Sequence, residues 1–185
     1  MLTARNLVQL RQKLRGFAAE KSATAAIEFA MVLPLMVSLY LGGVEISQAV
    51  SADRKVSLVA RSVADLVSQY KSVTNADLSG VMAAGTAVVA PFDSSKLSIV
   101  VSSVRIDSTS KATIDWSYAS NASARTKGAS VTVPAGLLTP SSSLIWAEVK
   151  YAYKPTIGYV ITGTKNLADQ IYMRPRNSDS VGPPP

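Results

Sequence analysis

Hydrophobic and polar residues follow three different patterns along the chain. From Thr24 to Val44 almost every residue is apolar or small, and Glu28 carries the only charge. Between residues 56 and 70, apolar residues recur at three- and four-residue spacing, which is typical of an amphipathic helix. After Pro91 they alternate singly with polar residues, as in half-buried strands. The pattern predicts a long helix followed by a β-rich region.

The apolar run is long enough to cross a membrane, because about twenty helical residues at roughly 1.5 Å each span a hydrocarbon core. Residues 1–23 hold five basic residues, whereas the stretch after the run, through residue 62, holds three. The positive-inside rule therefore predicts a cytoplasmic N-terminus and an external C-terminal domain. Pro34 and the Gly42-Gly43 pair are expected to kink or soften the helix. Glu45 marks the outer boundary, where we expect a solvated side chain.

A second, shorter helix is predicted from Ala76 to Val89, ahead of Pro91. Thr74, followed three residues later by Asp77, is a capping signal for its start. Single alternation then predicts four strands, at Leu97–Val101, Ile114–Tyr118, Ile145–Tyr153 and Leu167–Met173. The connections between them are mostly short, which favours an antiparallel sheet.

These elements predict an α+β fold in which a long N-terminal transmembrane and amphipathic helix packs on a small antiparallel β-sheet, a pilin-like architecture. Four segments are expected along the chain. They are a basic cytoplasmic leader at 1–23, a transmembrane helix at 24–44, a pilin-like α+β domain at 45–173 and a disordered Pro-rich tail at 174–185.

Composition narrows the possible functions. The chain has neither Cys nor His, which removes thiol nucleophiles, imidazole bases and the usual zinc ligands. The net charge of +7 is concentrated in residues 1–23, so we expect no nucleic-acid partner. Asp107 and Asp115 could be neighbours across a hairpin, but nothing in the sequence shows that they are enclosed or perturbed. We therefore expect no enzyme activity, no catalytic residue, no metal and no cofactor.

The aromatic residues of the β-rich region could form a platform for a ligand. Aromatic side chains in alternating strands more often form core or cross-strand contacts, and this is the interpretation that we favour. The residues concerned are Trp116, Tyr118, Trp146, Tyr151, Tyr153 and Tyr159.

Residues 23–34, Ala-Thr-Ala-Ala-Ile-Glu-Phe-Ala-Met-Val-Leu-Pro, resemble the opening of TadE-like and TadG-like proteins of the tight-adherence (Tad/Flp) pilus. The apolar run that closes with Gly43-Val44-Glu45 extends this resemblance over about residues 20–62. It implies a minor pilin-like (pseudopilin) or accessory subunit for assembly of an adhesion pilus. The protein would be single-pass in the inner membrane, with a periplasmic domain. Its partners would be other Tad subunits, the inner-membrane assembly platform and the lipid bilayer.

The resemblance also implies a processing site. In TadE-type members a prepilin peptidase cuts five residues before the Glu, which here is the bond between Ala23 and Thr24; TadG-type members keep the anchor uncut. The residue before this bond is usually Gly, whereas this chain has Ala23. A carboxylate inside an apolar span needs a partner or access to the interface. After cleavage the new amine could pair with Glu28, so Glu28 and Phe29 are the candidate residues for subunit register and assembly; otherwise Glu28 would reach the headgroups.

Two other functions stay open. Val50-Ser51-Ala52 has small residues at suitable places for signal-peptide cleavage before Asp53, which would release a periplasmic binding module. A membrane-tethered hydrolase that uses Ser and Lys would represent the enzyme class.

Overall fold

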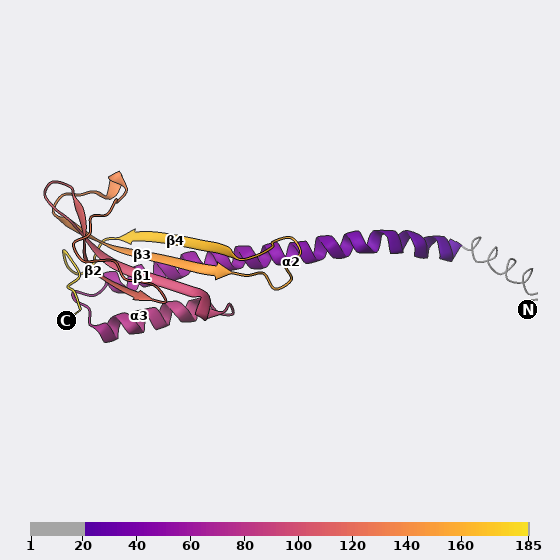
Figure 1. The fold of residues 1–185 in the computed structure, drawn as a ribbon, viewed down its shortest axis with the longest axis horizontal. Coiled ribbons are helices and arrows are strands. Elements are labelled where there is room, and N and C mark those ends of the chain that lie inside the picture. Colours follow the sequence, from indigo (N-terminus) through magenta and orange to yellow (C-terminus); the bar gives the residue numbers. More distant parts are fainter. Residues whose placement is uncertain (1–20, 185) are drawn as a thin grey trace, which may run out of the picture.

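The computed structural model describes residues 21–184 and has the α+β layout that the sequence predicts (Figure 1). Two helices, α2 (Lys21–Ser68) and α3 (Asn75–Val88), precede the four strands. The strands are β1 (Leu97–Ile106), β2 (Ala112–Ser120), β3 (Ser142–Tyr153) and β4 (Lys165–Met173). Two short 3-10 helices complete the set, η1 (Ser94–Lys96) before β1 and η2 (Ala135–Leu137) between β2 and β3.

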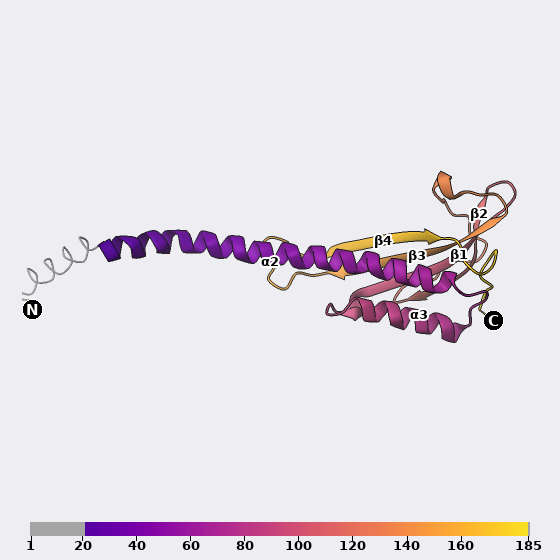
Figure 2. The same ribbon diagram turned by 180° about the vertical axis from the view of Figure 1, so that it is seen from behind.

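Helix α2 has 48 residues and passes through Pro34 without a break in its helical assignment. At 1.5 Å per residue it is about 70 Å long, far longer than the sheet needs as a cover. Its C-terminal half lies along the sheet, and most of its N-terminal half projects beyond the rest of the described chain (Figures 1 and 2). The same helix therefore has two different surroundings.

All four strands pair antiparallel, in the order β2-β1-β3-β4. The long central pair β1–β3 begins with Leu97 opposite Tyr151 and ends with Ile106 opposite Ser142. The β1–β2 register shifts between Ser103 and Val104, a bulge of the kind that twists a sheet locally. The predicted strands and their antiparallel arrangement are confirmed.

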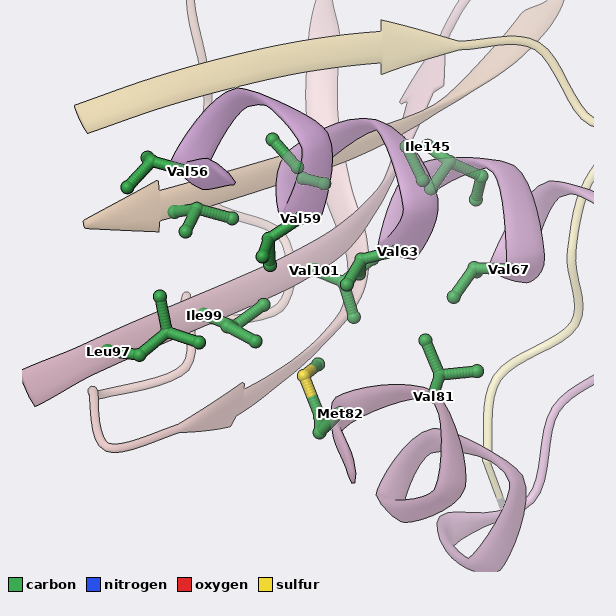
Figure 3. Close-up of a cluster of buried hydrophobic side chains, with 14 of the residues drawn as sticks. Val56, Val59, Val63, Val67, Val81, Met82, Leu97, Ile99, Val101 and Ile145 are labelled. Atoms are coloured by element: carbon green, nitrogen blue, oxygen red, sulfur yellow. The ribbon is translucent and has the colours of Figure 1, made fainter. Parts of the chain in front are cut away.

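The main core lies between one sheet face and the two helices. Val56, Val59, Val63 and Val67 come from successive turns of α2 and belong to this core. Figure 3 shows Val59 and Val63 near Ile99 and Val101 of β1, and Val67 facing Val81 of α3. Val59, Val63 and Val67 have no exposed surface. The three- and four-residue spacing in the sequence thus corresponds to the buried stripe of the amphipathic half.

Helix α3 covers the remaining edge of this core. Thr74 caps it as predicted: its hydroxyl accepts a hydrogen bond from the Asp77 N–H, and the Asp77 carboxylate accepts one from the Thr74 N–H. Gly85 lets the two helices approach closely, because a Cβ at this position would lie 2.9 Å from Val63 Cγ2 and 3.2 Å from Ile99 Cδ1.

A second, smaller core lies on the opposite face of the sheet. Even-numbered positions of β1 and β3 contribute to it, and the segment around η2 covers it. Its buried members are Val104, Ile106, Ala112, Ile114, Val133, Leu144 and Trp146.

The C-terminal segment differs from the disorder that its composition suggests, because residues 174–184 pack on the end of α2. Val181 is fully buried, and its carbonyl accepts a hydrogen bond from Trp116 Nε1 at 2.8 Å. Gly182 exchanges backbone hydrogen bonds with Lys71 and Val73. Buried backbone groups that find partners in this way hold an extended segment without regular structure.

Candidate functional site

The N-terminal half of α2 is an exposed apolar surface. It belongs to a helix that is long and apolar enough, by length and composition, to cross a membrane. Only 6% of the apolar stretch of this helix is buried. This half of α2 therefore does not belong to the buried core, in contrast to the C-terminal half. Its exposed large hydrophobic side chains are Ile27, Phe29, Met31, Val32, Leu33, Leu35, Met36, Val37, Leu39 and Tyr40.

The predicted processing and register residues lie at the start of this surface. Ala23 and Thr24 follow one another within α2, close to its first described residue. Glu28 is exposed and makes no hydrogen bond or ion pair with another side chain in residues 24–184, and its neighbour Phe29 is also exposed. On a helix, positions 24 and 28 lie on one face, one turn apart. The leader at 1–23 falls largely outside the described residues.

Glu45, at the other end of the apolar half, is the most enclosed charged group in the described chain. It is 1% exposed, in contrast to the solvated boundary residue that we expected. The connection between β3 and β4, residues 154–164, folds over it; we call this segment the β3–β4 loop. Its position beside α2, where the helix leaves the sheet, can be seen in both views (Figures 1 and 2).

Four consecutive backbone N–H groups of the β3–β4 loop donate to the Glu45 carboxylate. Oε1 accepts from Gly158 at 2.5 Å and from Tyr159 at 3.1 Å. Oε2 accepts from Val160 at 2.6 Å and from Ile161 at 2.9 Å. Gly158 has φ +72°, a conformation that glycine adopts without strain and that helps successive N–H groups face the same way.

These bonds favour the ionised form of the carboxylate. The hydrogen bond from Ile161 is the largest cause that lowers the pKa of Glu45 below its ordinary value, and burial opposes it. The bonds from Val160, Gly158 and Tyr159 lower the pKa further. The carboxylate satisfies four backbone donors that would otherwise need water.

Two further contacts hold the loop against α2. Gly42 is buried, and a Cβ there would lie 3.0 Å from Val160 Cγ2, so the glycine makes room for the loop. The Tyr159 hydroxyl lies 3.1 Å from Ser38 Oγ and donates to it, while Ser38 Oγ donates to the Pro34 carbonyl at 2.7 Å. The β3–β4 loop thus reaches back along α2 into the apolar half.

Comparison with protein families identifies the helix that carries these residues. Residues 23–65 match the family model described as TadE-like protein. The chain carries a TadE-like segment. This agrees with the resemblance seen in the sequence, and it links the chain to the Tad pilus in general terms. No curated protein and no solved structure matches the chain significantly.

The TadE-like segment includes the candidate processing bond, Glu28 and Glu45, and it ends within the amphipathic half of α2. The β3–β4 loop lies outside it. The Glu45 contacts therefore join the TadE-like segment to a part of the chain that the family model does not cover.

The aromatic side chains do not share one platform, because they are divided between the two sheet faces and the loop. Trp116, Tyr151 and Tyr153 are buried in the main core. Trp146 belongs to the second core, where its ring stacks on Tyr172 with centroids 5.4 Å apart. Tyr159 is the exception to the expected packing, because it is 58% exposed in the β3–β4 loop.

Arg125 covers the outer side of this aromatic stack. Its guanidinium lies 3.9 Å from the Trp146 ring centroid and makes two hydrogen bonds of 2.7 Å to the Glu148 carboxylate. The bonds to Glu148 raise the pKa of Arg125, which favours the charged guanidinium. The Arg125 contacts tie the segment after β2 to β3, and no pattern in the sequence predicts them.

The two candidate carboxylates have structural partners. Asp107 accepts hydrogen bonds from the N–H groups of Thr109 and Lys111 in its own turn. Asp115 pairs with Arg105 at 3.3 Å. Among the described residues, no three Asp or Glu side chains lie close enough to hold a metal ion.

Proposed function

We propose that this protein is a membrane-anchored minor pilin-like (pseudopilin) or accessory subunit for assembly of a Tad/Flp adhesion pilus. The observation that carries the proposal is the exposed apolar half of α2, which lies within the TadE-like segment and has Glu28 near its start. An apolar surface of this length must be covered by lipid or by other subunits. Its partners would be the inner-membrane lipid bilayer, other Tad subunits and the assembly platform.

In this proposal residues 24–44 cross the inner membrane, the basic leader is cytoplasmic and residues 45–173 form a periplasmic domain. Prepilin peptidase would cut between Ala23 and Thr24. The new α-amine would then lie one helical turn from Glu28, within reach of the carboxylate in the same or a neighbouring subunit. Pairing would offset the cost of a carboxylate within the apolar span and set the register of stacked helices. Phe29, exposed beside it, would contribute apolar contact area.

The released binding module receives no support from the geometry. Its cleavage point, before Asp53, lies within the continuous helix α2, and Ala52 is buried in the main core at 1% exposure. Cleavage there would also separate Glu45 from the four N–H groups that it binds.

The first experiment is the intact mass and N-terminal sequence of the protein purified from membranes. A start at Thr24 identifies a processed pseudopilin and gives Glu28 an amine partner. A start near Met1 identifies an uncut, TadG-type anchor, in which Glu28 reaches the membrane interface. A start at Asp53 in the soluble fraction would overturn the proposal.

Pilus assembly in a strain lacking the gene tests the role itself. Deletion should remove surface filaments and attachment, and the wild-type gene should restore them. Glu28→Gln should restore much less, since it removes the charge and keeps the size. Asp53→Asn is the matched control, because Asp53 is an exposed carboxylate on the same helix beyond the apolar half. Normal filaments without the protein would refute the proposal.

A further inference from the structure

The β3–β4 loop carries an unusual set of exposed side chains. Ile157, Tyr159 and Val160 are 45%, 58% and 51% exposed. Among the described residues, every other exposed large hydrophobic side chain lies on α2. The rest of the sheet domain therefore has an ordinary polar surface, and the loop resembles the membrane-facing helix instead.

The loop lies beside the apolar half of α2, so its exposed apolar side chains extend the apolar surface of the helix. Val160 packs against Gly42, and Tyr159 reaches Ser38, two positions in the last turns of the apolar half. The three exposed side chains thus lie next to the end of the segment that crosses the bilayer in the proposed function. The patch is continuous with the lipid-facing surface rather than isolated on the domain.

Hydrogen bonds within the protein satisfy four backbone N–H groups of the loop, as a region with little water requires. Irregular backbone is costly near lipid because its N–H groups lack partners. Here the Glu45 carboxylate binds four of them, from Gly158 to Ile161, and is itself 1% exposed. The side chains of Ile157, Tyr159 and Val160 remain available on the outside.

The charges and residue types beside the patch also fit a lipid headgroup layer. Lys154 and Lys165 are exposed at the two ends of the loop, where an ammonium group can meet lipid phosphates. Tyrosine is enriched at membrane–water interfaces, since its ring is apolar and its hydroxyl is polar.

We propose that the β3–β4 loop is a second membrane-contact element, which Glu45 locks to α2 so that Ile157, Tyr159 and Val160 enter the headgroup layer of the bilayer. The inference rests on the proposed function in one respect, that residues 24–44 cross the membrane. It goes further in giving the domain a fixed orientation: the end of the sheet that carries this loop lies on the lipid. The β1–β2 turn at the opposite end points away from it.

The absence of cysteine from the sequence makes a direct test possible. Single cysteines are introduced into the full chain, labelled with an environment-sensitive fluorophore, and reconstituted in phosphatidylethanolamine–phosphatidylglycerol vesicles. Ile157→Cys reports on the loop, Val32→Cys on the apolar half of α2, and Ser108→Cys on the exposed β1–β2 turn. Quenching is measured with lipids that carry a spin label near the headgroup or deep in the acyl chain, and with a water-soluble quencher.

The Ile157 probe should lie about 5–10 Å into the boundary between headgroups and acyl chains. We expect the headgroup quencher to reduce its emission severalfold more than that of the Ser108 probe. The Val32 probe should respond most to the deep quencher. Glu45→Gln, added to the Ile157→Cys variant, should lower the lipid quenching, whereas Asp53→Asn should leave it unchanged.

Three outcomes would overturn the inference, and they are distinguishable. A water-exposed Ile157 probe beside a lipid-quenched Val32 probe refutes the loop contact and leaves the anchor intact. Water exposure of both probes refutes the anchor of the proposed function as well. Protection of Ile157 from both kinds of quencher means that protein, such as a second copy of the chain, covers the patch instead of lipid.

Discussion

Both halves of α2 are rich in apolar residues, yet only the C-terminal half packs against the sheet and α3, and the β3–β4 loop reaches no more than the last turns of the N-terminal half. Val59, Val63 and Val67 are fully buried against the sheet and α3, whereas Val32 and Val37 remain 48% and 45% exposed. Local sequence makes both halves helical, but the spacing of their polar residues differs. The C-terminal half has an apolar stripe opposite a polar face, so one protein surface is enough to cover the stripe. The N-terminal half is apolar on all sides, so it needs lipid or neighbouring subunits all round.

The largest difference between the two halves of α2 is expected when the same charged residue, Asp, is placed in each of them. Val63→Asp puts an unpaired carboxylate into the main core, and we expect it to lower the free energy of unfolding by about 4 kcal/mol or more. Val32→Asp should change the unfolding of the domain by no more than about 0.5 kcal/mol, because this side chain contacts none of the core. Denaturant unfolding in detergent, followed by tryptophan fluorescence, measures both.

Membrane association should respond in the opposite way. An Asp near the middle of a spanning helix costs about 2.5–3.5 kcal/mol on insertion scales, so Val32→Asp should release part of the protein from membranes on carbonate extraction. If Val32→Asp and Val63→Asp lowered the free energy of unfolding equally, both halves of α2 would have to contribute to the domain core, against the contrast drawn between them.

A smaller effect is expected at α3, which covers the C-terminal half only. Thr74→Ala removes the hydroxyl that accepts a 3.1 Å hydrogen bond from the Asp77 N–H, and so breaks the capping box. The expected loss in free energy of unfolding is about 1 kcal/mol. Thr126→Ala, in an exposed loop, is the matched control and should be close to neutral. A Thr74 variant as stable as the control would mean that α3 adds little to the cover of α2.

The sequence predicts the parts of this structure that have a periodic or local pattern of residues. Valines one helical turn apart, Thr74 with Asp77, and the single alternation in the strands each carry local information, and the helices, strands and antiparallel sheet follow from them. The apolar run and the TadE-like pattern also lie within a short stretch, which is why the candidate site around Glu28 could be proposed from sequence alone.

The Glu45 contacts could not be predicted in the same way. The donors lie 113 to 116 residues from Glu45 along the chain, and they are backbone N–H groups, which no side-chain pattern marks. The packing of the C-terminal segment was missed for a similar reason. Its Pro-rich composition gives no sign that Val181 is buried, and the Val181 carbonyl accepts its hydrogen bond from Trp116, which lies 65 residues away along the chain.

The most local test of the comparison is the titration of Glu45, where the two halves of α2 meet. Hydrogen bonds from the β3–β4 loop, that of Ile161 foremost, lower the pKa of Glu45 below its ordinary value of 4.5. A carboxyl whose pKa is lower in the folded state stabilises that state above the unfolded value, and this contribution is lost as the pH falls through the folded pKa. The loop should therefore stay locked at neutral pH and loosen only below about pH 4.5.

Amide NMR of the detergent-solubilised protein measures this directly. The N–H resonances of Gly158 and Val160, which make the shortest bonds to the carboxylate, should move together with one midpoint below 4.5. Tyr153, the titratable neighbour whose pKa is raised by burial and by the Glu45 charge, changes protonation only far above this range. Glu45→Gln cannot ionise, so the shared midpoint should disappear in that variant while the amides of the core strands stay unchanged. A midpoint that persists in Glu45→Gln would assign the transition to another carboxyl and would mean that the loop is held without the Glu45 charge.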